Sequence, residues 1–386
     1  MLNEADEHQE IRDAVRHLCS QFPDEYFRKV DELRAYPEKF VDALMEAGWL
    51  AAMIPEEYGG TGLGLTAATV IMEEINRSGG NSGAVHGQMY NMGTLLRNGS
   101  KAQKEKYLPP IAAGKLRIQS MAVTEPTTGT DTTKIKTIAV KKDGRYVVNG
   151  QKVWISRVQH SDLMVLLART TPLAEVKKKS EGMSVFIVDL HQAIGKGLSV
   201  RPIPNLVNHE TNELFFDNLE IPEENLVGEE GKGFKYILDG LNPERMLIAA
   251  EALGIGRVAL EKAVKYGNER VVFNRPIGMN QGLQFPLADS LARLDAAELV
   301  LRKATWLYDN GKPCGREANT AKYLCADAGF GAADRALQLH GGMGYSEEYH
   351  VARYFREARL LKIAPVSQEM ILNFLGEHVL GMPRSY

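Results

Sequence analysis

The stretch that decides the fold is MAVTEPTTGTD, residues 121–131, followed by NGQKVWIS, residues 149–156. The first stretch begins with an apolar run and ends in a turn rich in hydroxyl groups and glycine. The second reads as a short strand that carries the indole of Trp154. Backbone N–H groups in such a turn can hold phosphates, and a flat aromatic group can lie on a strand that carries an indole. The two stretches together predict a site for a phosphate-bearing aromatic cofactor.

Around this stretch the chain has the patterns of a β-sheet. Residues 145–148 and 151–155 flank the pair Asn149-Gly150 and predict a hairpin, because Asn-Gly supplies the positive φ angles of a type I′ turn. The β segment is expected to end near Gly228–Gly233. Further strands are predicted at three short apolar runs bounded by turn residues, 163–167, 184–188 and 214–216.

Both flanks of the β segment have helical periodicity. Residues up to about 118 read as helices, with the pattern resuming at Ala67–Ile75. After the β segment, Asn242-Pro243 predicts an N-cap and the first residue of a helix that runs toward Tyr266. Two more long helices are predicted at 283–307 and 318–339. The chain is therefore α, then β, then α, and we expect domains at residues 1–118, 119–228 and 229–386.

Composition limits the possible partners and locations. The 386 residues predict two or three domains, and 46 Lys+Arg against 49 Asp+Glu give no strong field toward nucleic acid or membrane. The basic run Lys177–Lys179 is expected to be a solvated loop. No apolar run reaches the ~18 residues of a membrane span. Three cysteines without metal-ligand spacing indicate a reducing compartment and no metal site. The acidic start, residues 1–7, lacks the features of a signal or transit peptide, so we expect a cytoplasmic protein.

A second glycine-rich segment is QLHGGMGY, residues 338–345, followed by Glu348, Arg353 and Glu357. Such glycines can simply end a helix, or they can let the backbone approach a ligand where a Cβ would not fit. A third segment is ERVVF, residues 269–273, with Gln281 eight residues beyond it. None of the three segments identifies a function alone.

Together, the segments at 121–134 and 338–357 resemble the two signature patterns of the acyl-CoA dehydrogenase family. The first departs from its pattern at Thr128 and Lys134, whereas the second follows its pattern. The segment at 270–281 is similar to the family's Arg-x-x-Phe-Gly-x-x-Ile-Gly-x-x-Gln, with Asn274 in place of the first glycine.

The resemblance implies an α+β multidomain fold with an N-terminal α-helical domain, a middle β-barrel-like domain and a C-terminal four-helix bundle. It also implies FAD bound between the middle and C-terminal domains, an acyl-CoA substrate, an electron-transfer flavoprotein as acceptor, and a homotetramer built as a dimer of dimers. The residues that it implies for FAD, partly across a subunit contact, are Met121, Val123, Thr124, Gly129, Thr130, Trp154, Ser156, Arg270, Phe273, Gln281, Gln338, Gly341, Gly342 and Ser367.

The chemistry of the family needs a carboxylate that removes the α-proton while the flavin takes the β-hydride. Most members place this Glu where the present chain has Pro365, which cannot act as a base. A minority, including isovaleryl and long-chain types, carry a Glu followed by Arg on another helix, and Glu244-Arg245 matches that pair. Glu244 is therefore the candidate base. It can also be read as a solvated first-turn Glu stabilised by the helix dipole. Glu369 is the fallback carboxylate.

Pro365 also affects the substrate site, where the resemblance implies contacts from Thr130, Arg245, Ala364 and Pro365. In the family, a backbone N–H at the position of Pro365 holds the thioester oxygen, and proline has none. Three explanations are open. The alignment is one residue off and the N–H of Val366 is the donor, or another donor takes its place, or the reaction is not ordinary dehydrogenation. Ala364 stands where a bulky Tyr is common, so we expect room for branched, cyclic or otherwise wide acyl groups.

Three functions follow from these residues. The first is FAD-dependent α,β-dehydrogenation of an acyl-CoA. The second is another reaction on a CoA thioester, either reduction of an enoyl-CoA, as in the crotonobetainyl-CoA reductase branch, or elimination without net oxidation. That branch also carries the Glu-Arg pair and lacks the C-terminal Glu. The third is a non-catalytic flavin- or CoA-binding subunit.

Overall fold

The computed structural model describes residues 8–385, and the chain divides into two compact units. The helical unit comprises Met1–Leu33, Gly64–Ser82 and Asn242–Tyr386, and the sheet unit comprises Arg34–Leu63 and Gly83–Leu241. Residues 1–7, on which the expectation about the N-terminus rests, lie outside the described residues. The domain boundaries expected at residues 118 and 228 stay a prediction.

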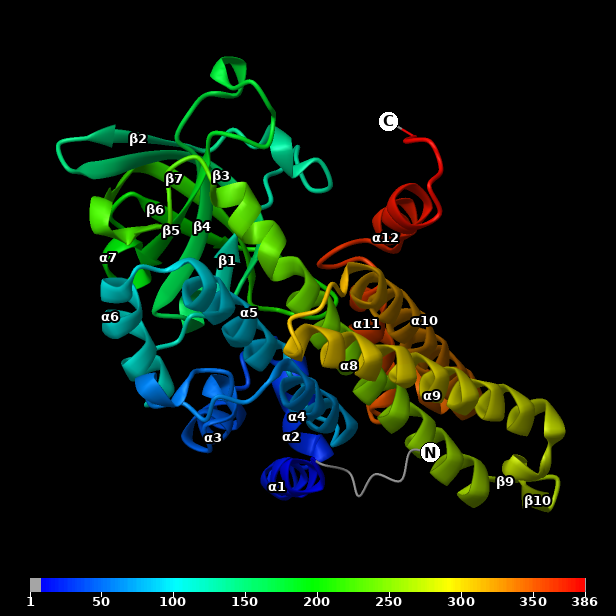
Figure 1. Cartoon of the computed structure of the whole chain (residues 1–386). Helices are drawn as coiled ribbons and strands as arrows, with labels where there is room; N and C mark the ends of the chain where they lie inside the picture. The colour runs from blue at the N-terminus through cyan, green and yellow to red at the C-terminus, as the bar shows by residue number, and fades with distance from the viewer. Residues whose placement is uncertain (1–7, 386) are drawn as a thin grey trace. The chain divides into compact units, whose positions relative to one another are not determined.

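The sheet unit is built on an eight-stranded sheet with the strand order β6-β7-β3-β2-β4-β5-β8, and β1 pairs with β4 in parallel (Figure 1). The strands are β1 (Ser120–Ala122), β2 (Ile138–Lys142), β3 (Arg145–Ser156), β4 (Leu163–Arg169), β5 (Met183–Asp189), β6 (Leu198–Pro202), β7 (Thr211–Pro222) and β8 (Leu226–Val227). The unit also contains the helices α3 (Glu38–Glu46), α5 (Gly83–Asn98), α6 (Lys101–Ala112) and α7 (Leu190–Ala193). The strands predicted at 163–167, 184–188 and 214–216 are confirmed as β4, β5 and part of β7.

The sheet is buried on both faces along β4. Met164 and Leu166 belong to one apolar cluster, with Tyr146 and Phe186, whereas Val165 belongs to the other. This second cluster includes side chains from α5 and α6. Because alternate residues of a strand point to opposite faces, β4 reads as one unbroken apolar run.

The hairpin predicted at Asn149-Gly150 is wrong. Strand β3 continues through these residues, and the turn lies at Asp143-Gly144, where both residues have positive φ, 49° and 74°. Gly150 lies instead at an irregularity in the pairing of β3 with β7, with φ 149°. A Cβ at Gly150 would lie 2.5 Å from the hydroxyl oxygen of Thr137. The Asn-Gly pair therefore lies at a β-bulge, where the backbone closely approaches Thr137, rather than in a turn.

The helical unit is dominated by long helices, and Figure 1 shows α9 and α10 running side by side. Its helices are α1 (Gln9–Cys19), α2 (Asp24–Glu32), α4 (Leu65–Arg77), α8 (Gly233–Glu269), α9 (Gln281–Asp309), α10 (Gly315–His340), α11 (Val351–Leu361) and α12 (Gln368–Phe374). The short strands β9 (Val271–Val272) and β10 (Arg275–Pro276) form a hairpin after α8. The helices predicted at 283–307 and 318–339 are confirmed as α9 and α10.

The helix start predicted at Asn242-Pro243 is wrong. Helix α8 begins at Gly233, in the sheet unit, and Pro243 lies inside it. Proline has no N–H, so the carbonyl four residues earlier loses its intrahelical donor. The helix continues despite this loss because residues 246–250 after the proline are buried in the core. Tertiary packing here outweighs a local helix-start signal.

Buried ion pairs join α8 to its neighbours in the helical unit. Glu73 of α4 accepts from Arg302 of α9 at 2.7 Å and lies 3.4 Å from Arg257 of α8. The adjacent Glu74 accepts from Arg12 of α1 at 2.6 Å. Both carboxylates are almost fully buried. Such multiply paired guanidinium–carboxylate contacts fix the relative position of the helices that carry them.

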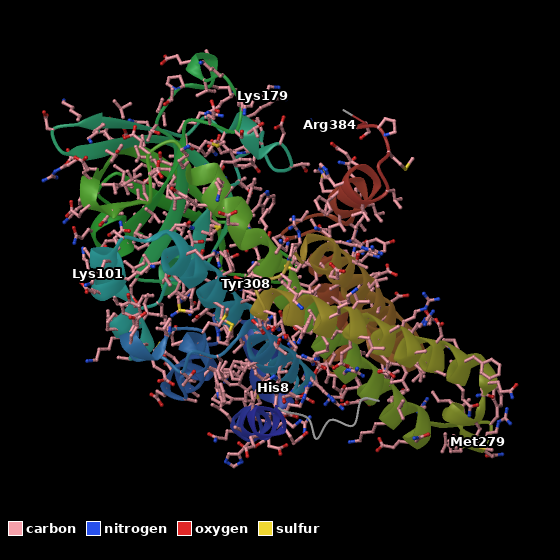
Figure 2. All side chains as sticks on the ribbon, in the orientation of Figure 1. His8, Lys101, Lys179, Met279, Tyr308 and Arg384 are labelled. Atoms are coloured by element: carbon pink, nitrogen blue, oxygen red, sulfur yellow. The ribbon has the colours of Figure 1, made fainter. Side chains whose placement is uncertain are left out.

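The peripheral predictions can be located in Figure 2. Lys177–Lys179 are exposed, which confirms the solvated loop, and Lys179 lies in the loop that leads into β5. Met279 lies beyond the β9–β10 hairpin at one end of the helical unit. No helix among residues 8–385 combines the length and apolar character that a membrane crossing needs.

Candidate active site

Glu244 is a buried carboxylate on α8, only 7% exposed. It lies three turns into the helix, so the interpretation as a solvated first-turn Glu is wrong. No residue between 8 and 385 donates a hydrogen bond to its carboxylate. Burial raises the pKa of Glu244 to about 7, against the opposing effect of the cations Arg245 and Lys322. A buried carboxyl group that titrates near neutral pH has the properties of a general base.

Arg245 lies beside this carboxylate with part of its hydrogen-bonding capacity unused. Its Nη1 donates to the side-chain oxygen of Asn242 at 3.0 Å. Its Nε is buried and finds no acceptor in the described part of the chain. Burial lowers the pKa of Arg245, and Glu244 opposes that effect. An unsatisfied buried guanidinium N–H is costly, so this group is poised to meet an acceptor from a ligand.

Lys322 is a functional candidate that sequence reasoning missed. Its side chain is fully buried on α10, and its ammonium donates to the carbonyl of Val366 at 2.7 Å. Burial lowers the pKa of Lys322 to about 8, and Arg245 adds repulsion. The signal in the sequence was a lysine at a core position of a helical pattern, between the buried residues Ala318 and Cys325.

The segment from Lys362 to Gln368 carries the residues that replace the usual base. Pro365 is exposed and Ala364 is half-buried. Ser367 uses its hydroxyl oxygen to accept from the N–H of Met370, so it caps α12. Glu369 is exposed on α12, and its own N–H and the Ser367 hydroxyl lower its pKa. A carboxylate of this kind is a weaker base than Glu244.

In the sheet unit, a buried ion pair holds the turn that follows β1. Lys152 donates to the carboxylate of Glu125 at 3.0 Å and to the carbonyl of Val123 at 2.8 Å. Glu125 also accepts from the N–H groups of Lys136 and Thr137, at 2.6 Å and 2.9 Å. Burial lowers the pKa of Lys152 to about 8, although Glu125 opposes it. For Glu125, Lys152 and the N–H donors outweigh burial and lower the pKa.

The turn held in this way presents its far end to solvent. Gly129 and Thr130 are exposed, and their N–H groups donate to no carbonyl within the described ranges. Met121, Val123 and Thr124 are partly buried, and the N–H of Val153 donates to the carbonyl of Thr124 at 2.9 Å. The turn therefore has free backbone donors on a fixed base, which suits the phosphates of the predicted cofactor.

Trp154 has an unusual backbone and an exposed ring. Its φ is 64°, rare for a bulky residue, and its side chain is 59% exposed. Nearby, the hydroxyl of Ser156 accepts from the side-chain amide of Asn208 at 2.8 Å. An indole held outward by a strained backbone is a feature that functional sites often have. Trp154 and Ser156 therefore fit a wall for a flat ring.

The remaining predicted cofactor residues gather at one end of the helical unit. Tyr266 near the end of α8 stacks on His340 at the end of α10, with ring centroids 4.2 Å apart. This contact brings the end of α8, which leads to Arg270, close to the second glycine-rich segment. Phe273 is 94% exposed with φ 52°. The others at this end, Gln281, Gln338, Gly341 and Gly342, are also exposed.

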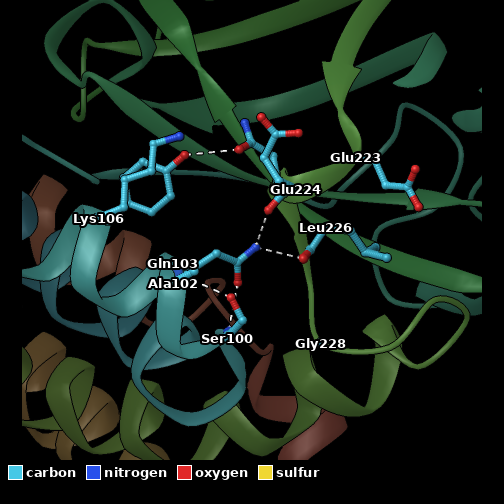
Figure 3. A pocket seen from close by; sticks show the side chains of 10 residues that line it. Ser100, Ala102, Gln103, Lys106, Glu223, Glu224, Leu226 and Gly228 are labelled. Atoms are coloured by element: carbon cyan, nitrogen blue, oxygen red, sulfur yellow. Dashed lines mark hydrogen bonds between the residues drawn. The ribbon is translucent and has the colours of Figure 1, made fainter. Parts of the chain in front are cut away.

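Residues of the predicted site do not line the cavity of about 370 Å³ drawn in Figure 3. That cavity lies in the sheet unit where α6 meets the segment before β8. Gln103 spans it by donating to the carbonyls of Glu224 and Leu226, both at 2.8 Å, and Tyr107 donates to Asn225 at 3.1 Å. Gln103 and Tyr107 thus connect α6 to the segment before β8, so the cavity lies at a structural contact between these two elements.

The fold and these residues define a class of helix–sheet–helix enzyme. Family models for the N-terminal, middle and C-terminal domains of acyl-CoA dehydrogenase match residues 5–115, 120–219 and 231–380. The chain belongs to the acyl-CoA dehydrogenase family, whose members are oxidoreductases, and the family prediction and its fold class are confirmed.

Relatives cover almost the whole chain. An acyl-CoA dehydrogenase of Bacillus subtilis is 36% identical over 92% of this chain and 93% of its own. The cyclohex-1-ene-1-carbonyl-CoA dehydrogenase of Syntrophus aciditrophicus is 35% identical over 98% and 91%. The 3-(aryl)acrylate reductase of Clostridium sporogenes is 33% identical over 97% and 99%.

Solved structures have the same fold. Butyryl-CoA dehydrogenase from Megasphaera elsdenii is similar with a TM-score of 0.91 and 30% identity, over 98% of this chain and 100% of that one. The FAD complex of PigA is similar in fold, with a TM-score of 0.90 and 23% identity over 99% of each chain.

Proposed function

We propose that the protein catalyses FAD-dependent α,β-dehydrogenation of an acyl-CoA thioester, with Glu244 as the base and an electron-transfer flavoprotein as the acceptor. One observation carries the proposal. Glu244 is buried without a hydrogen-bond donor from the described residues, and its pKa is raised to about 7. A structural carboxylate in the same place would be paired. A base for a weakly acidic α-proton needs an unpaired carboxylate in a dry site.

The cofactor is FAD, which when bound supplies the acceptor for the β-hydride. The free N–H groups at Gly129 and Thr130 suit its phosphates, and the outward indole of Trp154 suits its ring. Met121, Val123, Thr124 and Ser156 complete the flavin end. The adenine end is assigned to Arg270, Phe273, Gln281, Gln338, Gly341 and Gly342, and Ser367 is kept as a further contact.

In the proposed reaction, the step carried out by protein side chains is the transfer of the α-proton. The carboxylate of Glu244 takes the α-proton, and the cations Arg245 and Lys322 favour the charged form of that carboxylate against the effect of burial. Pro365 cannot polarise the thioester. The N–H of Val366 has no acceptor among residues 8–385, so we assign it as the donor for the thioester oxygen. This assignment corresponds to an alignment shifted by one residue.

The acyl group is proposed to be cyclic, aryl-bearing or branched. Ala364 is half-buried in the segment that carries Val366, and its methyl group replaces a bulkier side chain. Removing that bulk leaves space near Cα and Cβ of the acyl chain. Two relatives support this choice through their names, the cyclohex-1-ene-1-carbonyl-CoA dehydrogenase and the 3-(aryl)acrylate reductase.

The second candidate function is reduction of an enoyl thioester. It is favoured by the reductase of Clostridium sporogenes, which is similar over 97% of this chain. The same Glu244 would then deliver a proton to Cα instead of removing one, because proton transfer is reversible. The charged groups of the site, Glu244, Arg245 and Lys322, are the same for dehydrogenation and for reduction, so they do not distinguish the two reactions.

The test is the visible spectrum of the purified protein, followed without oxygen as acyl-CoA thioesters are added. Bleaching of the oxidised flavin band by saturated cyclohexanecarbonyl-CoA or 3-phenylpropanoyl-CoA, ahead of butyryl-CoA, is the expected result. Faster bleaching by butyryl-CoA would overturn the wide acyl pocket. If no saturated thioester bleaches the flavin, but enoyl thioesters reoxidise the chemically reduced protein, the second function holds. No response to either would leave elimination or a non-catalytic subunit.

The rate of flavin reduction should depend on pH through Glu244. Only the deprotonated carboxylate can accept the α-proton, so the rate should rise with a midpoint near pH 7 and level off above about pH 8. Stopped-flow reduction at saturating thioester between pH 5.5 and 9 measures this directly. A rate that is flat from pH 5.5 upward would contradict the raised pKa, because an ordinary Glu is already ionised there.

The assembly is proposed to be a homotetramer, a dimer of dimers. Leu291, Leu299 and Trp306 form an exposed apolar stripe along α9, 47%, 58% and 51% exposed. Glu244 and Arg270 are 26 residues apart on and just beyond α8, about 39 Å at 1.5 Å per residue. One copy therefore does not bring its base and its adenine residues together, and a second copy would supply them. A monomer in sedimentation analysis of the FAD-loaded protein would exclude this assembly.

A further inference from the structure

Stability alone does not explain why the ammonium of Lys322 is buried. Its side chain is fully buried on α10, among residues that include Ala318, Ala321 and Cys325, all fully buried. Taking an ammonium out of water is costly, and an apolar side chain of similar volume usually serves a core as well or better. A charge kept at such a position points to a role in the chemistry beside it.

Within residues 8–385, Lys322 makes one hydrogen bond, and its acceptor lies in the segment from Lys362 to Gln368. Its Nζ donates to the carbonyl of Val366 at 2.7 Å. One turn of chain later, the side chain of Gln368 donates to the carbonyl of Tyr323 at 3.5 Å, a weaker second tie between the same elements. Anchoring the carbonyl of Val366 fixes the peptide plane that precedes α12. The N–H of Val366 belongs to the same residue, so its direction is limited as well.

The charges that face Lys322 come from three elements. Glu244 and Arg245 lie on α8, Glu369 lies on α12, and Lys362 follows α11. Glu244 and Glu369 attract the ammonium, whereas Arg245 and Lys362 repel it. Lys362 is also paired with Asp327 at 2.8 Å. Of the two attracting carboxylates, Glu369 acts more strongly on Lys322 but is exposed to solvent. Glu244 is buried, so its charge depends on the cations beside it, Arg245 and Lys322.

We propose that Lys322 is a positioning residue for the proton transfer: its ammonium anchors the Val366 backbone and stabilises the ionised form of Glu244. The inference rests on the proposed role of Glu244 as the base. Lys322 is a second cation beside the Glu244-Arg245 pair. It also fixes the orientation of the segment that begins at Pro365, in which the proline has no backbone N–H to donate.

The test separates the charge from the hydrogen bond. Lys322→Gln keeps a donor for the Val366 carbonyl and removes the charge, and Lys322→Met removes both. Lys322→Arg keeps the charge. The first readout is the pH titration of the carboxylic C=O infrared band of Glu244, assigned by its loss in Glu244→Gln. The second is hydrogen exchange of residues 364–369 by mass spectrometry, and the third is the pH profile of flavin reduction.

Without the ammonium, the midpoint of Glu244 should move up by about one pH unit in both Lys322→Gln and Lys322→Met. At pH 7 this shift corresponds to about fivefold slower flavin reduction, with full recovery above about pH 9. Lys322→Arg should restore the midpoint. Exchange at 364–369 should rise in Lys322→Met and stay near the parent value in Lys322→Gln.

Lys362→Met is the matched control, because it removes a lysine charge from a partly exposed site near the same segment. Its infrared midpoint should equal that of the parent. A midpoint unmoved in Lys322→Gln, or moved equally in Lys362→Met, overturns the proposal. The infrared titration does not depend on turnover. If Glu244→Gln still reduces flavin, the base assignment fails, whereas a moved Glu244 band would still establish the electrostatic effect of Lys322.

Discussion

Replacing Glu244 by Gln is expected to lower the rate of flavin reduction by an acyl-CoA about 10²–10⁴-fold, the usual contribution of a general base. Gln has nearly the same shape but cannot accept the α-proton. The stretch proposed for the flavin and its phosphates lies in the sheet unit, and Glu244 is not among the proposed FAD contacts, so the variant should retain the oxidised flavin spectrum. Stopped-flow reduction at pH 8, where the parent carboxylate is ionised, compares the two proteins directly.

Stability gives an independent check on the same variant. Burial raises the pKa of Glu244 from 4.5 to about 7, so the folded protein binds a proton more tightly than the unfolded chain. The stability supplied by this group is full below pH 4.5 and is lost as pH rises through 7. At about 1.4 kcal/mol per pH unit, the loss is about 3 kcal/mol. Glu244→Gln should therefore resist urea better than the parent at pH 8, with the gain vanishing at low pH.

Glu369→Gln is the control, because Glu369 was the other candidate carboxylate and is exposed. It should reduce flavin at nearly the parent rate. If Glu369→Gln loses activity and Glu244→Gln keeps it, the assignment of the base is reversed. Loss in neither variant would exclude both carboxylates as the base, and another group would then have to accept the α-proton.

The sequence predicted correctly those helices and strands whose formation depends on residues close together in the chain. Strands β4 and β5 are buried on both faces, so their apolar runs are unambiguous, and α9 and α10 show long helical patterns. The two errors in the predicted secondary structure arose where local signals compete. Asn149-Gly150 and Asp143-Gly144 have the same turn chemistry, and only the pairing of β3 with β7 decides between them. Pro243 marks a helix start locally but lies in a packed helix.

The residues of the candidate site could be proposed from the sequence to the extent that the family pattern names them. Glu244 followed from the Glu-Arg pair, but its burial and the lack of a donor among residues 8–385 did not, because both depend on distant helices. Lys322 is 77 positions beyond Arg245 in the sequence, and no local pattern connects them. Lys152 stood within the opening stretch without an assigned role, because its partner Glu125 lies 27 residues away. Buried charges of this kind are determined by tertiary contacts.

The buried ion pair of Glu125 and Lys152 is the source of the second large effect that we expect, a loss of stability. Glu125→Met should lower the free energy of unfolding by about 3–5 kcal/mol, because it leaves the ammonium of Lys152 buried without its carboxylate. It also removes the acceptor for the N–H groups of Lys136 and Thr137. Lys152→Met should cost less, since those two donors still bind the Glu125 carboxylate. The double variant should recover part of the loss, because it leaves no unpaired charge.

Urea unfolding of the parent, both single variants and the double variant measures the coupling of the pair. The flavin absorbance per polypeptide in the same samples reports whether the turn still holds FAD. Lys134→Met is the matched control, since Lys134 pairs with Asp131 on the surface of the same turn at 2.9 Å. Exposed pairs contribute little, so it should match the parent in both measurements. Equal effects of Glu125→Met and Lys134→Met would mean that the ion pair does not hold the turn. A large coupling together with lost flavin would mean that the base of the turn, through Glu125 and Lys152, positions the backbone donors that face the cofactor.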